Sequence, residues 1–311
     1  MSIARIYAIA LNTYREAVRD RVLFGVLVLA AGVLALTLAL AELSLDQHMR
    51  VVTDLGLASI SIFAVVVAIF LGSSLLYKEI ERKTLYVILP KPIARHEFLL
   101  GKYVGIVVTC VVFIAIMGAI QLLVTSIQAG ASTPLVIGVP VGLLIVLAAG
   151  LVLAKDRTTV VPVWSVLALA ASAWLCSTVD VPLFRLLASL ALSGGEVMIL
   201  TAVALLFSSF STPFLTGAFT FGVWLVGRSA DDMVAMKSRV LSPEVKTFLS
   251  WLAEVVPNFN LFVPGRETLV AASAGVGTPI GYVVTSLGYA ALYATATLVI
   301  AAAIFRRRDF L

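Results

Sequence analysis

Residues 22–41 read VLFGVLVLAAGVLALTLALA and contain no charged side chain. At 1.5 Å per residue, a helix of this length spans about 30 Å, the thickness of a bilayer's hydrocarbon core. The stretch is too long for the apolar core of a signal peptide, and 21 polar-flanked residues precede it. It therefore predicts a first membrane span that the mature protein retains.

Apolar stretches also dominate the rest of the 311-residue chain, which is 61% hydrophobic and only 13% charged. Soluble domains contain about 25% charged residues, so lipid must be the solvent for much of this protein. A backbone in lipid must form its hydrogen bonds internally, which leaves helices or a closed barrel. The stretches are continuous and lack the alternation of barrel strands. We therefore expect an all-α, polytopic integral membrane protein with a single transmembrane domain over residues 1–311.

Hydropathy predicts about eight transmembrane helices. The double glycine at 194–195 lies inside the sixth, and leaves open a division into an interfacial helix and a short span. The predicted spans are 22–41, 55–76, 103–127, 134–154, 159–176, 182–207, 213–226 and 279–305.

The basic residues orient these spans. Eight crossings place both termini on one side, and if that side is cytoplasmic, 15 of the 22 basic residues lie inside. The positive-inside rule therefore predicts a multi-pass protein with both termini in the cytoplasm. Because the basic residues flank apolar spans, the formal charge of +5 indicates orientation and not a nucleic-acid partner.

Two segments outside the spans are amphipathic. Residues 1–21 combine apolar positions at helical spacing with arginines on the other side, which predicts an interfacial helix at the membrane surface. Residues 227–278 are expected outside, with a second amphipathic helix that begins at Ser242-Pro243-Glu244. That helix either covers an exit or rests on the lipid headgroups.

The sequence lacks the motifs of enzyme sites. It contains no G-x-x-x-x-G-K-[ST] phosphate loop, no H-E-x-x-H and no G-x-S-x-G. Cys110 and Cys176 are isolated in apolar runs and give no metal-ligand spacing. We therefore expect a protein that is not itself an enzyme and that binds no metal or cofactor of its own. Pairs of glycines at 101/105, 138/142 and 277/281 allow close helix packing, although such pairs are common by chance.

The longest charged stretch predicted inside the cell is Tyr77–Lys102. It begins with an acidic and basic cluster and continues through Pro90-Lys91-Pro92 into a short helical run that ends near Leu100. The prolines separate that short helix from what precedes it. The stretch is either a solvated loop or a rigid helix that receives a push from a soluble partner.

Glu196 is a possible intramembrane polar site. In the predicted sixth span it lies about 18 Å from the cytoplasmic end at 1.5 Å per residue. A carboxylate at that depth usually faces a cavity, a partner or another helix. Alternatively, Gly194-Gly195 ends one helix and Glu196 begins the next, where the helix dipole favours an acid.

Several motifs resemble those of ABC-2 type transporter permeases. Glu81–Leu85, Leu89–Arg95 and Phe98–Lys102 are similar to the family patterns E-x-x-x-G-T-L, L-x-x-P-[VI]-[SA]-R and L-L-G-K. Lys83 stands where the family often has glycine, and Pro90 is an additional proline. The resemblance covers about 1–128 and 195–311, so residues 130–194 look like a helical pair inserted into a six-span core.

The C-terminal third resembles the subgroup that includes the permease of the nitrous-oxide-reductase copper-maturation system. The residues that carry this likeness are Leu206–Ser211, Gly227-Arg228-Ser229, Pro257–Phe262 and Phe305–Phe310.

The resemblance implies a permease subunit of an ATP-driven exporter in a prokaryotic plasma (inner) membrane. Two separate ATPase subunits would bind ATP and Mg²⁺, and a second permease copy or a paralogue would complete the complex. The family's coupling helix corresponds here to Pro92, Ile93, Ala94, Arg95, His96, Glu97 and Phe98. The neighbouring Glu79, Glu81, Arg82 and Lys83 would support that loop.

Other functions stay open at this point. A secondary transporter or channel independent of ATP would need intramembrane charges at matching places in two halves, and only Glu196 qualifies. An intramembrane enzyme would need a pair of catalytic groups. The substrate could be a lipid, a peptide or a hydrophobic drug, or the permease could transmit force to an extracytoplasmic partner.

Overall fold

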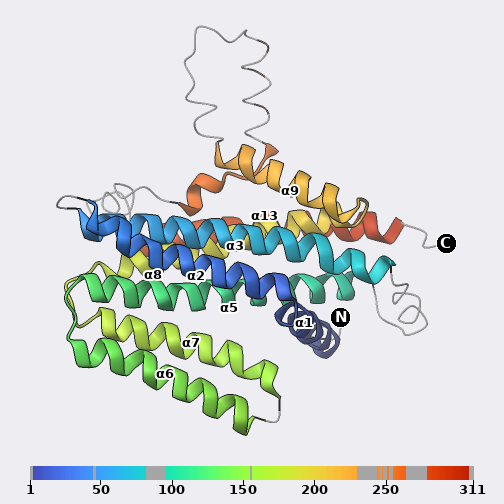
Figure 1. Cartoon of the computed structure of the whole chain (residues 1–311). Helices are drawn as coiled ribbons and strands as arrows, with labels where there is room; N and C mark the ends of the chain where they lie inside the picture. Colours follow the sequence, from blue (N-terminus) through green and yellow to red (C-terminus); the bar gives the residue numbers. More distant parts are fainter. Residues whose placement is uncertain are drawn as a thin grey trace. The chain divides into compact units, whose positions relative to one another are not determined.

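The computed structural model describes residues 3–44, 47–81, 95–154, 156–229, 244, 247, 251, 255–263 and 279–307, with only the backbone at 75–81, 95, 157 and 307. These residues form helices and turns without a β-strand, which confirms the all-α prediction. The helices, labelled in Figure 1, are α1 (Ile3–Val18), α2 (Arg21–Glu42), α3 (His48–Glu81), α5 (Arg95–Gln128), α6 (Thr133–Leu153), α7 (Arg157–Cys176), α8 (Leu183–Ser208), α9 (Pro213–Arg228), the 3-10 helix η1 (Phe259–Phe262) and α13 (Pro279–Arg307).

Seven of the described helices are long and apolar enough to cross a membrane, namely α2, α3, α5, α6, α7, α8 and α13. They correspond to seven of the eight predicted spans, so the chain is a polytopic membrane protein. The remaining prediction, the seventh span at residues 213–226, forms α9, which has only 16 residues. A straight crossing needs about 20 residues, so α9 is too short to complete one alone.

Helix α8 runs unbroken from Leu183 to Ser208 through both glycines at 194–195. The alternatives in which this double glycine divides the span, or in which Glu196 begins a new helix, are therefore wrong. Elsewhere the helix boundaries follow local chemistry. Asp20 and Asp156 accept hydrogen bonds from the first turns of α2 and α7, and Gly130 takes a positive φ of 78° between α5 and α6.

Helix α5 is also continuous, from Arg95 to Gln128. The short helix predicted up to Leu100 is therefore not a separate element, because it forms the first turns of the same helix as the third predicted span. No proline lies between the two to part them. Most of the amphipathic helix predicted from Ser242 onwards lies outside the described residues.

The chain divides into two compact units, which we describe separately. The first comprises residues 1–13, 68–107 and 195–311, and the second comprises residues 14–67 and 108–194.

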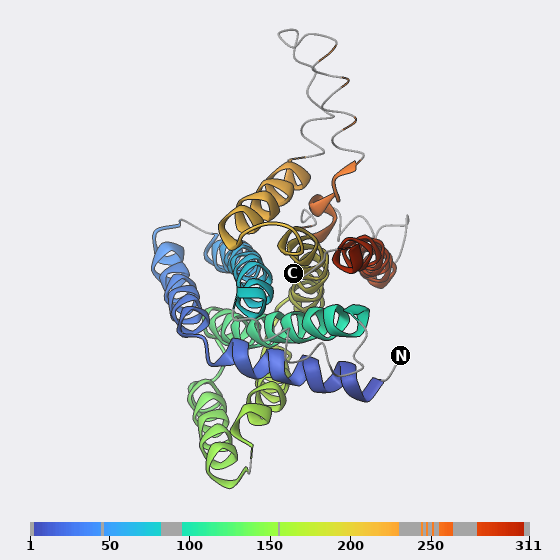
Figure 2. The same cartoon turned by 90° about the vertical axis from the view of Figure 1, so that its right-hand side faces the viewer.

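The C-terminal half of α8 forms the centre of the first unit. Seen end-on, it lies between α3, α5, α9 and α13 (Figure 2). A Cβ at Gly72 of α3 would lie 2.5 Å from Cβ of Ala204, so these two helices touch at backbone distance. Tyr103 of α5 donates a hydrogen bond to the carbonyl of Met198 at 3.3 Å. A carboxylate on this half of α8 is therefore enclosed by protein and not by lipid.

The second unit has small cores between long helices. One joins Ala41, Val52 and Val124, and another joins Leu122, Cys176 and Leu186. The hairpin of α6 and α7, which corresponds to the predicted insertion, is fastened by a hydrogen bond from Trp164 Nε1 to the carbonyl of Leu143 at 2.8 Å. Helix α6 buries none of its residues, so it offers its surface to an apolar environment.

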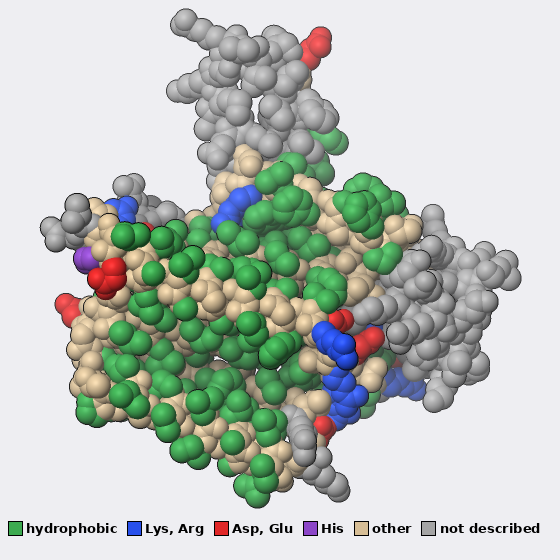
Figure 3. All heavy atoms as spheres, in the orientation of Figure 1, with side chains coloured by type: hydrophobic (Ala, Val, Ile, Leu, Met, Phe, Trp, Pro, Cys, Tyr) green, Lys and Arg blue, Asp and Glu red, His purple; other side chains and the backbone are tan. Residues whose placement is uncertain are grey.

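The surface agrees with a protein that lies in lipid. Figure 3 shows hydrophobic side chains over the faces of α2 and α3, with charged side chains gathered near the helix ends. Large side chains such as Phe24, Leu29 and Leu36 on α2 are more than half exposed. In water this surface would be costly, whereas lipid tails match it.

Candidate functional site

Most of the predicted ATPase-coupling segment lies outside the described residues. Pro92, Ile93 and Ala94 fall there, as do Arg82 and Lys83. The backbones of Glu79 and Glu81 belong to the last turns of α3, and Arg95 is the first residue of α5. The described side chains of the segment are therefore His96, Glu97 and Phe98, in the first turn of α5.

These three side chains point in different directions. His96 is exposed, whereas Glu97 is 4% and Phe98 is 5% exposed. Glu97 forms an ion pair with Arg5 of α1, with Arg5 Nη1 3.7 Å from its Oε2 atom. The ring of Phe98 stacks on Phe305 near the end of α13, with centroids 6.4 Å apart and planes 13° from parallel. The first turn of α5 is thus wedged between α1 and α13.

Lys102, one turn further along α5, is 1% exposed and belongs to the same junction. Its Nζ lies 6.0 Å from the centroid of the Phe98 ring, within the range of a cation–π interaction. If the start of α5 moved relative to its neighbours, this buried lysine would lose its surroundings. Its burial therefore adds to the free-energy cost of such a movement.

Helix α1 packs closely on α5 at the glycine pair 101/105. A Cβ at Gly101 would lie 2.6 Å from Ile9, and one at Gly105 would lie 2.6 Å from Cβ of Thr13. The pair therefore marks a close helix crossing, as the spacing allowed. At the pair 138/142 on α6, by contrast, an added Cβ would meet no described atom within 4 Å.

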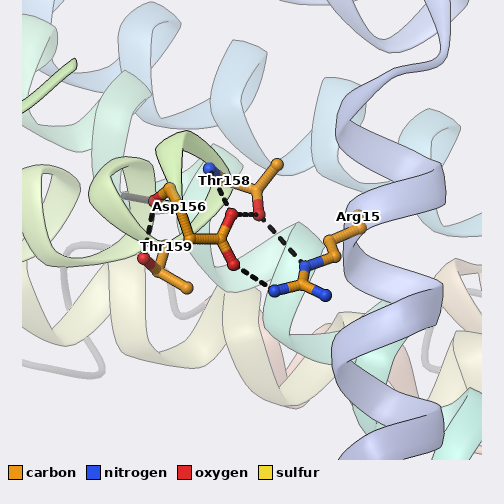
Figure 4. Close-up of polar contacts among 4 residues, drawn as sticks. All are labelled: Arg15, Asp156, Thr158 and Thr159. Atoms are coloured by element: carbon orange, nitrogen blue, oxygen red, sulfur yellow. Dashed lines mark hydrogen bonds and ion pairs between the residues drawn. The ribbon is translucent and has the colours of Figure 1, made fainter. Parts of the chain in front are cut away.

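Helix α1 also contacts the turn that precedes α7. Arg15 pairs with Asp156 and donates a hydrogen bond from Nε to Thr158 Oγ1 at 3.2 Å (Figure 4). Asp156 is the N-cap of α7 and accepts a hydrogen bond from the Thr158 hydroxyl at 2.8 Å. This hydrogen bond, with that from the Thr158 backbone and the charge of Arg15, lowers the pKa of Asp156 below its usual 3.8. The carboxylate is therefore charged at neutral pH, and its pairing is lost only when the pH falls below this lowered pKa.

Glu196 is fully buried on α8 and is paired with α9. Trp224 donates a hydrogen bond from Nε1 to Glu196 Oε1 at 2.8 Å, and Arg228 Nη1 lies 3.2 Å from the same oxygen. The Arg228 guanidinium also lies 6.0 Å from the centroid of the Trp224 ring. The carboxylate thus has a counter-charge and a neutral donor, both from one short helix.

Sequence reasoning identified Glu196 but missed its partners. Arg228 and Trp224 lie 32 and 28 residues away, and only the antiparallel pairing of α8 and α9 brings them to the carboxylate. The sequence signal that could have pointed to these partners was their spacing, because Trp224 and Arg228 are one turn apart on the same helix face. The burial of Glu97 and Phe98 was likewise not predicted, because the segment was interpreted either as a solvated loop or as a rigid helix that meets a soluble partner, and both are exposed.

The sequence pattern of ABC-2 family transporter proteins matches residues 7–310. A search of curated proteins finds no match to this chain. The family match covers nearly the whole chain and agrees with the seven candidate membrane spans. The chain therefore belongs to the ABC-2 family of transporter proteins, and is a membrane permease of that family.

Proposed function

We propose that this chain is the permease subunit of an ATP-driven exporter, in which two separate ATPase subunits bind ATP and Mg²⁺ and supply the energy. The family supports association with such ATPases. The chain carries no phosphate-binding loop, so hydrolysis belongs to the partners. In this proposal the chain catalyses no reaction and binds no cofactor of its own.

The observation that carries the proposal is the junction at the start of α5. The described coupling residues His96, Glu97 and Phe98 lie in the first turn of α5, which contacts α1 through Glu97 and α13 through Phe98. A push on this turn would therefore reach two further helices. His96 would face the ATPase, whereas Glu97 and Phe98 would transmit its movement.

The proposed orientation has both termini in the cytoplasm of a prokaryotic cell, with the protein in the inner membrane. Arg5 and Arg15 support it, because they bring α1 beside the start of α5 and beside the turn before α7, which are both basic regions. Seven full spans alone would place the termini on opposite sides, so this orientation also requires a crossing that includes α9.

We further propose one permease domain over residues 1–311, in a complex with a second permease copy or a paralogue. Helices α1, α3, α5 and α8 each contribute residues to both compact units, which supports a single domain. The motifs of the C-terminal third favour the subgroup of the nitrous-oxide-reductase copper-maturation permease. The complex would export a substrate or transmit force to an extracytoplasmic partner.

A secondary transporter fits the buried carboxylate less well. Ion-driven carriers use intramembrane acids that can bind and release an ion or a proton. Glu196 instead pairs with Arg228, a cation that belongs to the chain itself. This favours a structural use of the carboxylate over transport of a cation.

Two substitutions test the proposal with the assembled complex in liposomes. We expect His96→Glu to weaken co-purification of the ATPase, because it places a negative charge on the exposed docking face. Glu97→Gln should leave co-purification intact but lower permease-stimulated ATPase activity, because the link to Arg5 is lost. Unchanged binding and stimulation in both variants, or a complex that contains no ATPase, would overturn the proposal.

A further inference from the structure

Helix α13 carries side-chain contacts at two separate places along its length. Near its C-terminal end, the ring of Phe305 is 1% exposed and stacks on Phe98, in the first turn of α5. Nearer its other end, tyrosine side chains bind the backbone of residues 255–263. One helix therefore touches both the junction at the start of α5 and a second, largely non-helical segment of the first unit.

Three tyrosine hydroxyls make the second set of contacts. The hydrogen bonds run from Tyr282 to the carbonyl of Leu261 at 2.7 Å, from Tyr293 to the carbonyl of Val255 at 3.1 Å, and from the backbone N–H of Asn258 to Tyr289 at 3.2 Å. The tyrosines recur at seven- and four-residue intervals on one helix face, so the bound segment runs antiparallel to α13. Along the helix, Phe305 lies about 18 Å from Tyr293 and about 35 Å from Tyr282 at 1.5 Å per residue.

Residues 255–263 are also held by α8 and α9. In the end-on view they lie between α9 and α13 (Figure 2). The ring of Phe262 packs at Gly195 of α8, where a Cβ would lie 2.8 Å from its Cε1 atom. A Cβ at Gly227 of α9 would collide with the carbonyl oxygen of Pro257. The segment therefore bridges α13 to α8 and α9, and a shift of α13 along these helices must either move the segment or break its hydrogen bonds.

Helix α13 is suited to move as one body. Residues 289–307 contain neither glycine nor proline, at which helices commonly kink. Its buried side chains before the last turn are mostly small, namely Ser286, Ala290, Ala294, Thr297 and Ala301, with the larger Leu298 among them. Small side chains do not interlock deeply with a neighbouring helix, so a helix packed in this way can slide along its axis. A push on Phe305 would therefore reach the tyrosines.

We propose that α13 couples the first turn of α5 to residues 255–263, so that a displacement of either is transmitted to the other. The ring of Phe305 takes up the movement of Phe98, and the three tyrosines pass it to the segment. All four side chains of α13 are positioning residues. The coupling itself belongs to this chain and needs no ATPase, and only its use in export rests on the proposed function.

Hydrogen–deuterium exchange of the purified full-length permease, measured by mass spectrometry, tests this coupling. We expect Phe305→Ala to raise the exchange rate of the backbone amides of residues 255–263 at least ~5-fold, the lower end of typical allosteric couplings. Phe98→Ala removes the other ring of the same stack and should have the same effect. Phe305→Tyr keeps the ring and should exchange at the rate of the parent. An unchanged rate in both alanine variants would overturn the coupling.

A second background tests whether the effect passes through the tyrosines. The triple variant Tyr282→Phe, Tyr289→Phe and Tyr293→Phe keeps the three rings and removes the three hydrogen bonds, so it should itself raise the exchange rate of residues 255–263. Addition of Phe305→Ala to this variant should change the rate by less than ~2-fold, because effects that share one path do not add. Full additivity would overturn the proposed path.

Phe113→Ala is the matched control, because Phe113 is a phenylalanine of α5 that is only 2% exposed and lies in the second unit. It removes a buried ring without removing a contact of Phe305 or of the tyrosines. The exchange rate of residues 255–263 should stay at the parent value. A rise equal to that of Phe305→Ala would indicate general loosening of the protein and would overturn the coupling.

The assembled complex separates this inference from the proposed function. With the ATPase subunits bound, ATP and vanadate should alter the exchange of residues 255–263 in the parent but not in Phe305→Ala. A response that is fully preserved in Phe305→Ala would overturn the path through α13. A complex without an ATPase would instead overturn the proposed function, and the coupling measured in the permease alone would stand.

Discussion

At the scale of single residues, burial decides how much an ion pair contributes to the stability of this protein. Glu196 is fully enclosed, and its partner Arg228 is 24% exposed. Arg15 and Asp156, in contrast, are each more than a third exposed. An enclosed charge that loses its partner cannot turn to water, whereas an exposed one can. The two pairs should therefore respond very differently to the same kind of substitution.

Removal of the counter-charge of Glu196 should destabilise the protein strongly. We expect Arg228→Gln to cost about 3–5 kcal/mol, because the buried carboxylate loses its counter-charge. Thermal unfolding of the purified protein in detergent measures this as a lower Tm. Arg15→Gln serves as the comparison and should change the Tm little. A similar Tm for both variants would contradict the distinction between the two pairs.

The junction at α5 shows what a local motif can and cannot reveal. The prolines at 90 and 92 predicted a short helical run that ends near Leu100, since prolines act within one or two residues. The inward direction of Glu97 and Phe98 depends on Arg5 and Phe305, which the chain brings from its two ends. No pattern within the segment carries that information.

At the scale of elements, the helices divide by how much of their surface they bury. Helix α8 is buried along most of its length, and its small residues admit close neighbours such as Gly72. No residue of helix α6 is fully buried. Both were equally visible as spans, because hydropathy reports only that a segment prefers lipid or a protein interior to water. The prediction of residues 213–226 as a span rested on their apolar composition alone, since 14 residues are fewer than a straight crossing needs.

The two described glycine pairs provide a matched test of helix packing. Gly101→Leu should push α1 away from α5 and cost about 1–3 kcal/mol, because Ile9 occupies the space. Gly138→Leu should be nearly neutral, because no described atom lies within 4 Å of a Cβ at that position. Limited trypsin digestion at Arg15 and Arg19, together with the Tm, measures both effects. Equal resistance of the two variants to digestion would contradict the role of the 101/105 pair.

At the scale of the whole molecule, the number of crossings decides which ends of the chain can meet the same partner. Seven full spans together with a crossing that includes α9 would give the even number that the basic residues indicate. The docking segment, the N-terminal helix and the C-terminal end of α13 would then all be available to a cytoplasmic ATPase. The ion pairs of α1 fit a cytoplasmic position of this helix, because Arg5 pairs with Glu97 and Arg15 pairs with Asp156, two residues in segments expected inside.

Reporter fusions test this topology directly. Alkaline phosphatase is active only outside the cytoplasm, and green fluorescent protein fluoresces only inside. We expect phosphatase activity for a fusion after Gly130, and fluorescence for fusions after Asp156 and at the C-terminus. An active phosphatase at the C-terminus together with fluorescence after Asp156 would contradict an even number of crossings.

The separation of Glu196 from its partners also constrains how the protein is made. A ribosome completes the middle of α8 before it reaches Trp224 and Arg228, 28 and 32 residues later. During that interval the acid of α8 lacks the counter-charge of Arg228, and the comparable aspartate at the centre of a helix entering lipid costs about 2.5–3.5 kcal/mol. Helix α9 follows after a short turn and supplies the missing charge. Insertion of α8 is thus completed by α9, and the insertion machinery must retain the first helix until the second has been synthesised.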